Sequence, residues 1–353
     1  MRSRREVLHG LGAFGATLLA ARADALFAAT ARTAIDFTPP RDACDCHVHI
    51  FDPVRFPYVP KRVYTPPQAL IEDLLDLHNA LRMDRVVIVQ PSVYGADNSC
   101  TLDAVRTLGA RARGVAVIDG NTSRNEIDEM AAKGIRGIRL NLNTTPSGEI
   151  DADSSKRTLD TAVEQIHGHG WHIQFYTRPR VIAALKTHIE QLPFPVVFDH
   201  FGGAKAAQGP NQDGFGALLD LVKSGRAYVK ISGSYRASEK APDFPDVTPF
   251  AQALIAANPD RVVWGSDWPH PVSEFGRGRP LTDIAPPFAV DDGLVLNQLP
   301  KWAGDPALRR KILVDNAARL YDFADGDDIA TGSTRPTTVP TMPRAPAPVS
   351  PAH

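Results

Sequence analysis

Short hydrophobic runs rich in β-branched residues alternate along this chain with longer segments whose hydrophobic residues recur at helical spacing. The short runs have the length and composition of buried strands, and polar or glycine-rich residues follow each one. The pattern predicts eight strands, at 43–49, 85–91, 113–119, 134–142, 172–176, 196–200, 228–233 and 261–267. Segments with helical spacing include 67–82, 123–134, 155–170 and 307–323.

The order of these elements predicts the fold class. Strands that alternate with helices form parallel sheets, and eight such units favour a closed (β/α)8 TIM barrel over an open doubly wound α/β sheet. No GxGxxG or P-loop motif follows a predicted strand, which weakens a nucleotide-binding alternative. We therefore expect a single barrel domain over residues 40–325.

The two ends of the chain differ in composition from the barrel region. Residues 1–25 combine Arg4 and Arg5 with a weakly apolar run and a small-residue cleavage site. This order is typical of a twin-arginine (Tat) signal peptide; the alternative is an uncleaved amphipathic or membrane-anchoring helix. It predicts a periplasmic protein, with the Tat translocase as a transient partner and no stable membrane insertion. Residues 330–353, rich in Pro, Thr and Ala, are predicted to be a disordered tail.

Charge and cysteine content exclude several classes of function. Lys and Arg number 39 against 40 Asp and Glu, so no overall field favours nucleic acid or an anionic membrane. Cys44, Cys46 and Cys100 are too few for a disulfide framework and are interpreted as small apolar packing residues. Any preference for charged substrates must come from local residues.

Candidate chemistry follows from the faces of the strands. In a closed barrel alternate residues face the lumen, and active sites form at the carboxyl ends of the strands. Alternation assigns Asp45, His47 and His49 to the lumen face of the first strand, and Cys44, Cys46 and Val48 to its apolar face. It brings the following further polar residues to the same mouth: Arg139, Asn141, Gln174, Tyr176, His200, Lys230, Ser232 and Asp267.

Four of these side chains are candidate catalytic residues or metal ligands. His47 and His49 stand two residues apart at the end of the first strand, while His200 and Asp267 end the sixth and eighth. Each has a structural alternative, which is a hydrogen-bonded packing role for a histidine and a loop cap for the aspartate. Their convergence on one barrel mouth favours chemistry.

The other candidates and the other histidines are less decisive. Arg139 suits either substrate binding or an ion pair inside the barrel. Arg236 is either a substrate contact or an exposed loop residue, and Tyr176 either a substrate contact or lumen packing. His172 starts a strand, at the end opposite the chemistry. Histidines in helical segments are expected to be solvated, namely His78, His167, His169 and His188.

Eight segments taken in order resemble the amidohydrolase superfamily. They are DCHVHIFDP, RFPYVPKRVYTP, VVIVQPSVYGADN, GIRGIRLNL, WHIQFY, VFDHFGG, KISGSYR and WGSDWPHP. HVH after the first strand, a histidine ending the sixth and SD ending the eighth carry the superfamily pattern. Together the segments are similar to the branch that contains 2-pyrone-4,6-dicarboxylate lactonase, over residues 42–321.

The resemblance implies that water opens a small, carboxylated lactone. The aspartate matching Asp267 is then the general base, and His47, His49 and His200 polarise the lactone carbonyl or hold one metal ion. A carboxylate in a partly desolvated pocket can accept a proton from water, and hydrogen-bonding groups can stabilise charge on the carbonyl oxygen.

The resemblance also implies substrate contacts, and the chain departs from the pattern at two of them. Arg139, Arg236 and Tyr176 match positions that hold substrate carboxylates or polar groups, and Tyr64 reaches in from the loop after the first strand. The dicarboxylate lactonase has an arginine where this chain has Gly203, and another where it has Thr145.

The two missing arginines bear on the substrate. Arg178, just past the fifth strand, is a candidate replacement for one of them. Because arginine pairs well with carboxylates, their loss argues against 2-pyrone-4,6-dicarboxylate as the substrate. It favours a smaller or less charged lactone, from aromatic breakdown or from sugar acids.

The cofactor is either absent or one divalent metal ion, zinc or manganese. Many superfamily members carry a lysine that bridges two metals after strand four, but this chain reads RLNLN there, so a binuclear site is not expected. Members of the similar branch work with or without a metal. We expect a metal-independent mechanism, with a single-metal site at His47, His49, His200 and Asp267 as the alternative.

Two rival functions remain on the same fold. A zinc-dependent decarboxylase or amide hydrolase would use the same cluster of residues. Outside the enzymes, a periplasmic ligand-binding barrel is possible, although a mere binder has no need of three histidines and Asp267 at one mouth.

Overall fold

The computed structural model describes residues 32–143, 152–272, 280 and 283–324. The predicted signal peptide at 1–25, the predicted tail at 330–353 and Thr145 lie outside these residues.

The described residues form eight strands in one parallel sheet, in the order β1 to β8. Their bounds are β1 Cys44–Val48, β2 Arg85–Val89, β3 Ala112–Ala116, β4 Ile135–Asn141, β5 His172–Tyr176, β6 Val196–Phe198, β7 Ala227–Ser232 and β8 Val262–Gly265. Each strand begins and ends within three residues of its predicted bounds. The (β/α)8 barrel is confirmed.

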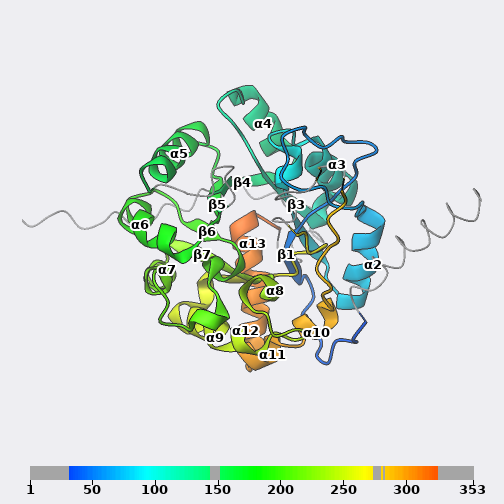
Figure 1. Cartoon of the computed structure of the whole chain (residues 1–353), viewed down its shortest axis with the longest axis vertical. Coiled ribbons are helices and arrows are strands. Elements are labelled where there is room, and N and C mark those ends of the chain that lie inside the picture. Colours follow the sequence, from blue (N-terminus) through cyan, green and yellow to red (C-terminus); the bar gives the residue numbers. More distant parts are fainter. Residues whose placement is uncertain (1–31, 144–151, 273–279, 281–282, 325–353) are drawn as a thin grey trace, which may run out of the picture.

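Helices surround the strands, as Figure 1 shows. They are α2 Ile71–Leu81, α3 Ser99–Leu108, α4 Arg124–Ala132, α5 Ala152–Gln165, α6 Pro179–Glu190, α7 Phe215–Lys223, α8 Ser234–Ala237, α9 Thr248–Ala257, α10 Asp292–Leu296, α11 Leu299–Trp302, α12 Pro306–Arg310 and α13 Asn316–Tyr321, with a π-turn at Lys311–Asp315 joining the last two. Within the described part of the chain, no helix combines the length and apolarity that a bilayer crossing requires.

Local sequence explains why the helices begin and pack where they do. Ser123 caps α4, because its hydroxyl accepts from the backbone of Glu126 at 3.3 Å while the Glu126 carboxylate accepts from the backbone of Ser123 at 2.7 Å. On α7, buried Phe215, Leu218 and Leu221 recur at helical spacing and face the barrel.

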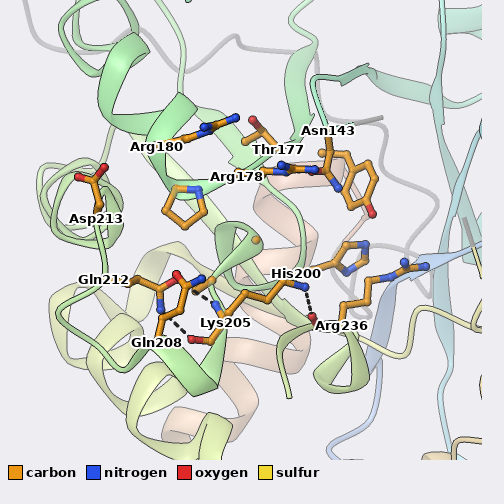
Figure 2. Close-up of a pocket in the computed structure, with 14 residues that line it drawn as sticks. Asn143, Thr177, Arg178, Arg180, His200, Lys205, Gln208, Gln212, Asp213 and Arg236 are labelled. Atoms are coloured by element: carbon orange, nitrogen blue, oxygen red, sulfur yellow. Dashed lines mark hydrogen bonds between the residues drawn. The ribbon is translucent and has the colours of Figure 1, made fainter. Parts of the chain in front are cut away.

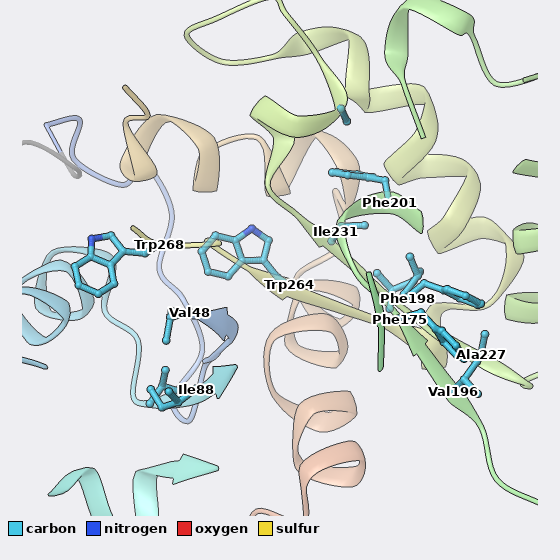
Figure 3. Packing of buried hydrophobic residues seen from close by; sticks show 14 of the residues in the cluster. Val48, Ile88, Phe175, Val196, Phe198, Phe201, Ala227, Ile231, Trp264 and Trp268 are labelled. Atoms are coloured by element: carbon cyan, nitrogen blue, oxygen red, sulfur yellow. The ribbon is translucent and has the colours of Figure 1, made fainter. Parts of the chain in front are cut away.

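Hydrophobic side chains fill two separate layers. The outer layer lies between the barrel and the helices, and Figure 3 shows part of it. In this layer Phe175 of β5 stacks on Phe198 of β6, with ring centroids 5.5 Å apart. The inner layer lies in the lumen of the barrel, because only there can side chains from six strands contact one another. Its strand residues are Cys44, Cys46, Val87, Val89, Val115, Val197, Tyr228 and Val263.

Helix α13 closes the amino-terminal end of the barrel. Its residues Ala317 and Tyr321 belong to the inner layer. The Tyr321 ring lies 5.3 Å from that of His172, the first residue of β5. His172 is therefore at the end opposite the predicted site, as expected.

The prediction for the two faces of β1 is partly wrong. Asp45 does not share the lumen with His47 and His49, and Cys44 and Cys46 lie in the inner layer. The cause is an irregularity in the pairing of β1 with β2 between Asp45 and Val48. Such a bulge inserts a residue, so strict alternation fails from that point on.

Asp45 instead points toward the helices, and its hydrogen bonds link β1 to the residue that follows β8. Its carboxylate accepts from the Ser266 hydroxyl at 2.5 Å and from the Ser266 and His47 backbones at 2.9 and 3.2 Å. His78 of α2 lies 3.4 Å away and is 2% exposed. The expectation that His78 is solvated is therefore wrong, because it packs over this buried carboxylate.

The barrel closes through backbone contacts beyond β8. The Asp267 amide donates to the His47 carbonyl at 2.9 Å, and the His49 amide donates to the Trp268 carbonyl at 2.8 Å. Gly265 permits this approach, since a Cβ there would lie 2.9 Å from the backbone nitrogen of His47. The closing contacts thus involve the candidate catalytic residues themselves.

Replacing Ser266 with alanine tests the Asp45 connection. The variant loses a hydroxyl that donates to Asp45 and accepts from the Trp268 amide at 3.0 Å. We expect its free energy of unfolding, measured in urea, to fall by about 1.5–3 kcal/mol, the contribution of a hydrogen bond to a charged group. Ser224→Ala, which removes a single contact to a backbone carbonyl, is the control. Equal losses in the two variants would contradict a special role for Ser266.

Candidate active site

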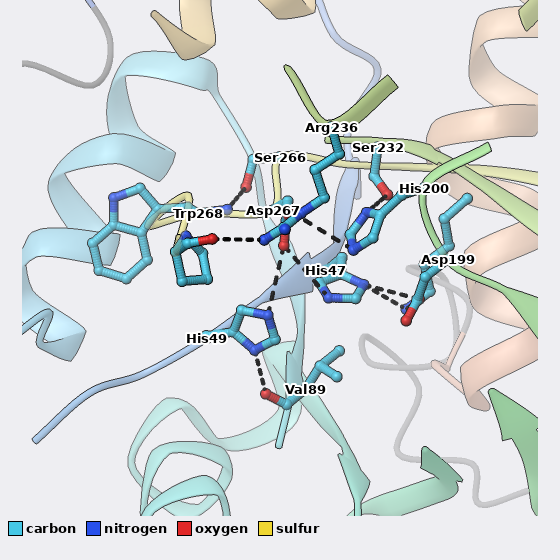
Figure 4. A network of polar contacts seen from close by, with 12 residues as sticks. His47, His49, Val89, Asp199, His200, Ser232, Arg236, Ser266, Asp267 and Trp268 are labelled. Carbon is cyan, nitrogen blue, oxygen red and sulfur yellow. Dashed lines mark hydrogen bonds and ion pairs between the residues drawn. The ribbon is translucent and has the colours of Figure 1, made fainter. Parts of the chain in front are cut away.

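The four predicted catalytic residues meet at the carboxyl end of the barrel. Asp267 Oδ1 lies 3.6 Å from His47 Nε2 and 3.5 Å from His49 Nε2, and Asp267 Oδ2 lies 3.7 Å from His200 Nε2. All four side chains are buried. Figure 4 shows the three rings arranged around the carboxylate, so one site brings together residues far apart in sequence.

In each histidine the Nδ1 atom, which faces away from Asp267, has a polar neighbour. His49 Nδ1 lies 2.7 Å from the Val89 carbonyl, and His200 Nδ1 lies 2.9 Å from the Ser232 hydroxyl. His47 Nδ1 lies 3.1 Å from Asp199 Oδ1. Val89 lies on β2, Ser232 on β7 and Asp199 directly after β6, and together these contacts direct every Nε2 atom at Asp267.

The contact of His49 also assigns its proton. A backbone carbonyl can only accept, so Nδ1 carries the hydrogen, and a neutral ring then has a lone pair on Nε2. Burial lowers the pKa of His49, which favours the neutral ring. His49 Nε2 and Asp267 Oδ1 are then two acceptors that face each other at 3.5 Å.

Burial has the same effect on the other two histidines. It lowers the pKa of His47 well below the ordinary value and that of His200 to about 4. Both rings are therefore neutral near neutral pH.

The two oxygens of Asp267 have different surroundings. Oδ2 accepts from the Tyr235 hydroxyl at 2.7 Å and from Arg236 Nε at 2.5 Å. Oδ1 is buried and has no hydrogen-bond partner among the described residues. Burial alone would raise the pKa of Asp267, but the Arg236 charge holds it well below its ordinary value, so the carboxylate is ionised.

Backbone conformation contributes to this geometry. Asp267 has φ 65° and His200 has φ 46°, both in the left-handed region that non-glycine residues rarely occupy. Such conformations cost free energy and concentrate at functional sites. Here they direct the two side chains into the lumen just beyond the ends of β6 and β8.

Asp199 is a central residue that the sequence interpretation missed. It accepts from Arg139 Nε at 2.9 Å and from Gln174 Nε2 at 3.1 Å, in addition to its contact with His47. Burial would raise its pKa, but its contacts with His47, Arg139 and Lys230 hold the pKa well below the ordinary value. The sequence did offer a signal for Asp199, because Arg139 and Lys230 in the lumen need a buried carboxylate to offset their charges.

Lys230 lies beneath this layer and is fully buried. Its ammonium group donates to the Cys46 carbonyl at 2.9 Å and to Gln174 Oε1 at 2.7 Å, and it lies 3.2 Å from His47 Nδ1. Burial lowers its pKa. Alternation had placed Lys230 and Gln174 in the lumen, and the structure confirms that placement.

A second buried pair lies behind Asp267 and was also missed. His270 Nε2 is 3.0 Å from Asp292 Oδ2, and the His270 ring meets the Tyr235 ring edge-on at 5.3 Å between centroids. Tyr235 in turn donates to Asp267. The pair supports the residues that orient the carboxylate.

The predicted substrate contacts lie around the histidines. A small cavity of about 20 Å³ is lined by His49, Tyr64, Arg139, Tyr176 and Arg236, among others. The Arg139 guanidinium lies 4.8 Å from the centre of the Tyr176 ring. Arg139 therefore forms the ion pair considered from the sequence, with Asp199 inside the barrel, and it also faces the cavity, where a substrate contact was the alternative.

A larger pocket opens on the other side of His200. Its volume is about 380 Å³, and Figure 2 shows its lining, which includes Tyr176, Arg178, His200, Lys205 and Arg236. Arg178 is thus near the site but not in the four-residue cluster.

The donor set is compatible with one divalent metal ion. His47 and His49 Nε2 with an Asp267 oxygen form a group of ligand atoms within 4.8 Å of one another, and all three residues are buried. His47 Nε2, His200 Nε2 and Asp267 Oδ1 have no hydrogen-bond partner within the described residues. Histidine nitrogens and carboxylate oxygens are the ligands that zinc accepts, so these orphaned atoms fit a metal.

Replacing Asp199 with asparagine tests the charge layer below the site. The change leaves Arg139 and Lys230 buried without their carboxylate, and breaking a buried pair in this way costs about 3–5 kcal/mol. We expect urea unfolding to show a loss of that size. Asp220→Asn, on the exposed face of α7, should change stability far less. A similar, small effect in both variants would show that Asp199 does not hold this layer together.

Comparison with known proteins places the chain in a family. The amidohydrolase family model matches residues 44–323. A 4-sulfomuconolactone hydrolase of Rhizobium radiobacter is 38% identical, over 81% of this chain and 92% of that protein. A 2-pyrone-4,6-dicarboxylate hydrolase of Comamonas testosteroni is 34% identical over the same shares. A solved structure from Agrobacterium tumefaciens is 27% identical with a TM-score of 0.67, covering 82% of this chain and 99% of that one. The chain belongs to the amidohydrolase family.

Proposed function

We propose that this enzyme hydrolyses a small anionic lactone, with Asp267 as the general base. One observation carries the proposal: an ionised, buried carboxylate oxygen, Asp267 Oδ1, has no hydrogen-bond partner among the described residues and faces two histidines. Relatives over most of the chain are named as lactone hydrolases, which supports the choice of substrate class.

The reaction follows from the two ends of the carboxylate. Arg236 and Tyr235 fix Oδ2, which leaves Oδ1 to take a proton from water as the water oxygen attacks the lactone carbonyl. The ring C–O bond then breaks, and the proton returns to the leaving oxygen. The product is an open-chain acid with a new hydroxyl or enol group.

We further propose that His47, His49, His200 and Asp267 hold one divalent ion, zinc or manganese. A proton or a cation is needed between His49 Nε2 and Asp267 Oδ1, because both are acceptors in the neutral-ring form. This weighs against the metal-independent mechanism expected from sequence. A bound ion would acidify water and polarise the carbonyl.

Arginines position the substrate in this proposal. Arg139 uses Nε for Asp199, and its terminal nitrogens make no hydrogen bond to the described residues, so they can receive a substrate carboxylate. Tyr64 and Tyr176 line the same small cavity as Arg139.

The test is turnover of a lactone panel by purified protein, with metal content measured before and after chelation. We expect hydrolysis that chelation abolishes and zinc or manganese restores. Activity that persists in metal-free protein would assign the histidines to direct contact with the carbonyl. Carbon dioxide release without lactone turnover would favour a decarboxylase. Tight binding of a lactone without conversion would favour a ligand-binding barrel.

Asp267→Asn tests the base separately. Loss of a general base lowers kcat by about 10²- to 10⁴-fold. Glu164→Gln, an exposed change on α5, is the control and should keep full activity. Circular dichroism would show that the Asp267 variant is folded. Near-normal kcat in that variant would remove Asp267 as the base.

We also propose export through the Tat pathway, on the evidence of Arg4 and Arg5 before a weakly apolar run. Replacing both with lysine should leave a tagged full-length chain in the cytoplasm, as seen by cell fractionation. Arg41→Lys, outside the proposed signal, is the control. Unchanged periplasmic recovery of the double variant would count against Tat export.

A further inference from the structure

We propose that residues 32–37 form a strap whose anchoring on helix α10 positions His270, and through it the carboxylate of Asp267. The inference rests on the proposed role of Asp267 as the general base and adds the part of the chain that keeps this base in place. Among the described residues that line the two spaces open to a ligand, neither His270 nor Asp292 is present. Both are therefore positioning residues, which act on the reaction through Asp267.

The strap is an extended segment with one face against the barrel. Ile35 and Phe37 are half-buried and pack on the outer hydrophobic layer, whereas Ala34 and Asp36 are exposed. Such alternation is typical of a half-buried extended chain. The Arg309 guanidinium lies 5.7 Å from the centre of the Phe37 ring. Figure 1 draws this segment in dark blue beside α10.

Hydrogen bonds join the strap to both ends of α10. Before the helix, the Asp291 carboxylate accepts from the Thr33 hydroxyl at 2.7 Å and from the Thr33 amide at 3.2 Å. After the helix, Asn297 Oδ1 accepts from the Asp36 amide at 2.9 Å, and Asn297 Nδ2 donates to the Ala34 carbonyl at 3.0 Å. Side chains at the helix ends thus satisfy the backbone groups of the strap, which fixes the two segments to each other.

Gly293 allows the strap to lie directly on α10. A Cβ at this position would lie 1.8 Å from the Thr33 carbonyl oxygen and 2.9 Å from the carbonyl carbon. Alanine favours a helix more than glycine does, so the helix itself gives no reason for glycine here. The close approach of the strap does give a reason.

Helix α10 depends on its neighbours for its position. It has five residues, Asp292–Leu296, and an isolated helix shorter than about 12 residues is marginal in water. Val295 and Leu296 belong to the outer hydrophobic layer and attach the helix to the barrel. The strap lies against the helix at Gly293, next to Asp292 in the sequence.

Asp292 transmits this anchoring to the segment that follows β8. Its Oδ2 atom lies 3.0 Å from His270 Nε2, and both side chains are buried. The His270 amide donates to the Asp267 carbonyl at 2.8 Å. The His270 ring meets that of Tyr235, whose hydroxyl donates to Asp267 Oδ2. His270 therefore contacts both the backbone of the base and a residue that orients its carboxylate.

The backbone of this segment needs outside support. Asp267 has φ 65° and His270 has φ 60°, and non-glycine residues keep such conformations only where the surroundings enforce them. Without the strap, Asp292 would lose its fixed position, and His270 would lose the partner of its ring. Asp267 would then shift relative to the three histidines. A displacement of about 1 Å at a reacting group can lower the rate about 10²-fold.

The place of the strap in the sequence sets a limit on processing. The strap follows shortly after the proposed signal peptide at 1–25. Removal of that peptide leaves every strap contact intact. Cleavage beyond Thr33 would remove the contacts with Asp291 and is expected to lower activity.

Two variants, each with a matched control, test the strap from opposite sides in the purified protein. Gly293→Ala pushes the strap away from α10; the control is Gly216→Ala on α7, where a Cβ would meet nothing within 4 Å among the described residues. Ile35→Asp places a charge on the packed face of the strap, and Ala34→Asp places the same charge on its exposed face. Because Ile35→Asp changes no residue of the barrel, it remains informative if Gly293→Ala does not fold.

Two NMR signals report on the site without any turnover. The proton between His270 Nε2 and Asp292 Oδ2 reports on the positioning pair, and the Arg236 Nε–H signal reports on the Asp267 carboxylate that accepts it. In Gly293→Ala and Ile35→Asp we expect both signals to shift or broaden, together with faster amide exchange in the strap. The two controls should match the parent protein. Fast exchange in the strap with both signals unchanged would overturn the coupling.

Kinetics with 4-sulfomuconolactone measure the effect on the reaction, with rates normalised to folded protein by circular dichroism. We expect Gly293→Ala and Ile35→Asp to lower kcat by about 10- to 100-fold with a smaller effect on KM, because the strap positions the base. Asp292→Ala should give the same pattern. Asp292→Asn, which keeps an oxygen beside His270, should retain kcat within about threefold. Equal losses in the alanine and asparagine variants would contradict a positioning role.

The two kinds of measurement separate this inference from the proposed function. If the NMR signals respond to the strap while no lactone is converted, lactone hydrolysis fails and the strap coupling stands. If lactone hydrolysis proceeds with unchanged kcat in both strap variants while strap exchange is fast, the coupling fails and the hydrolysis stands.

Discussion

Closure of the barrel through its candidate active site is the constraint on which the rest of this structure depends. The contacts that join β1 to the segment after β8 come from the backbones of His47, His49, Asp267 and Trp268. Because Cys44 and Cys46 lie in the inner layer, a regular pleat would turn His47 and His49 away from the lumen. The chain therefore uses an irregularity in β1 and a left-handed residue at Asp267. These conformations cost free energy, and the hydrogen bonds between Asp45 and Ser266 help to offset that cost.

Charge in the lumen is organised in two layers that share one histidine. Asp199 and Arg139 form the lower pair, and Asp267 and Arg236 form the upper pair. His47 lies between them, with Nδ1 toward Asp199 and Nε2 toward Asp267. Each buried carboxylate thus has its own guanidinium, which offsets the cost of removing the charges from water. Arg139 of the lower pair and Arg236 of the upper pair both line the small cavity, so both guanidinium groups face the space open to a ligand.

The sequence was sufficient for the fold and for the four clustered residues, because both follow from repeated patterns. Alternating strands and helices predict the barrel, and strand ends predict the mouth where His47, His49, His200 and Asp267 meet. Alternation failed at Asp45 because a bulge has no hydrophobic signature. Asp199 was missed because strand β6 ends at Phe198, so that both Asp199 and His200 face inward from a turn. Neither deviation is visible in a pattern with a period of two.

The chemical role of each histidine depends on which ring nitrogen carries the hydrogen, as well as on where the ring lies. Their positions are fixed by partners on other strands: Val89 on β2 for His49 and Ser232 on β7 for His200. The single N–H of a neutral His49 donates to the Val89 carbonyl, and burial disfavours a second proton on the ring. Direct polarisation of a lactone carbonyl by His49 Nε2 would need a hydrogen that this arrangement places on the other nitrogen. The same lone pair is what a metal ion requires, so the backbone of β2 favours a ligand role for His49 over a donor role.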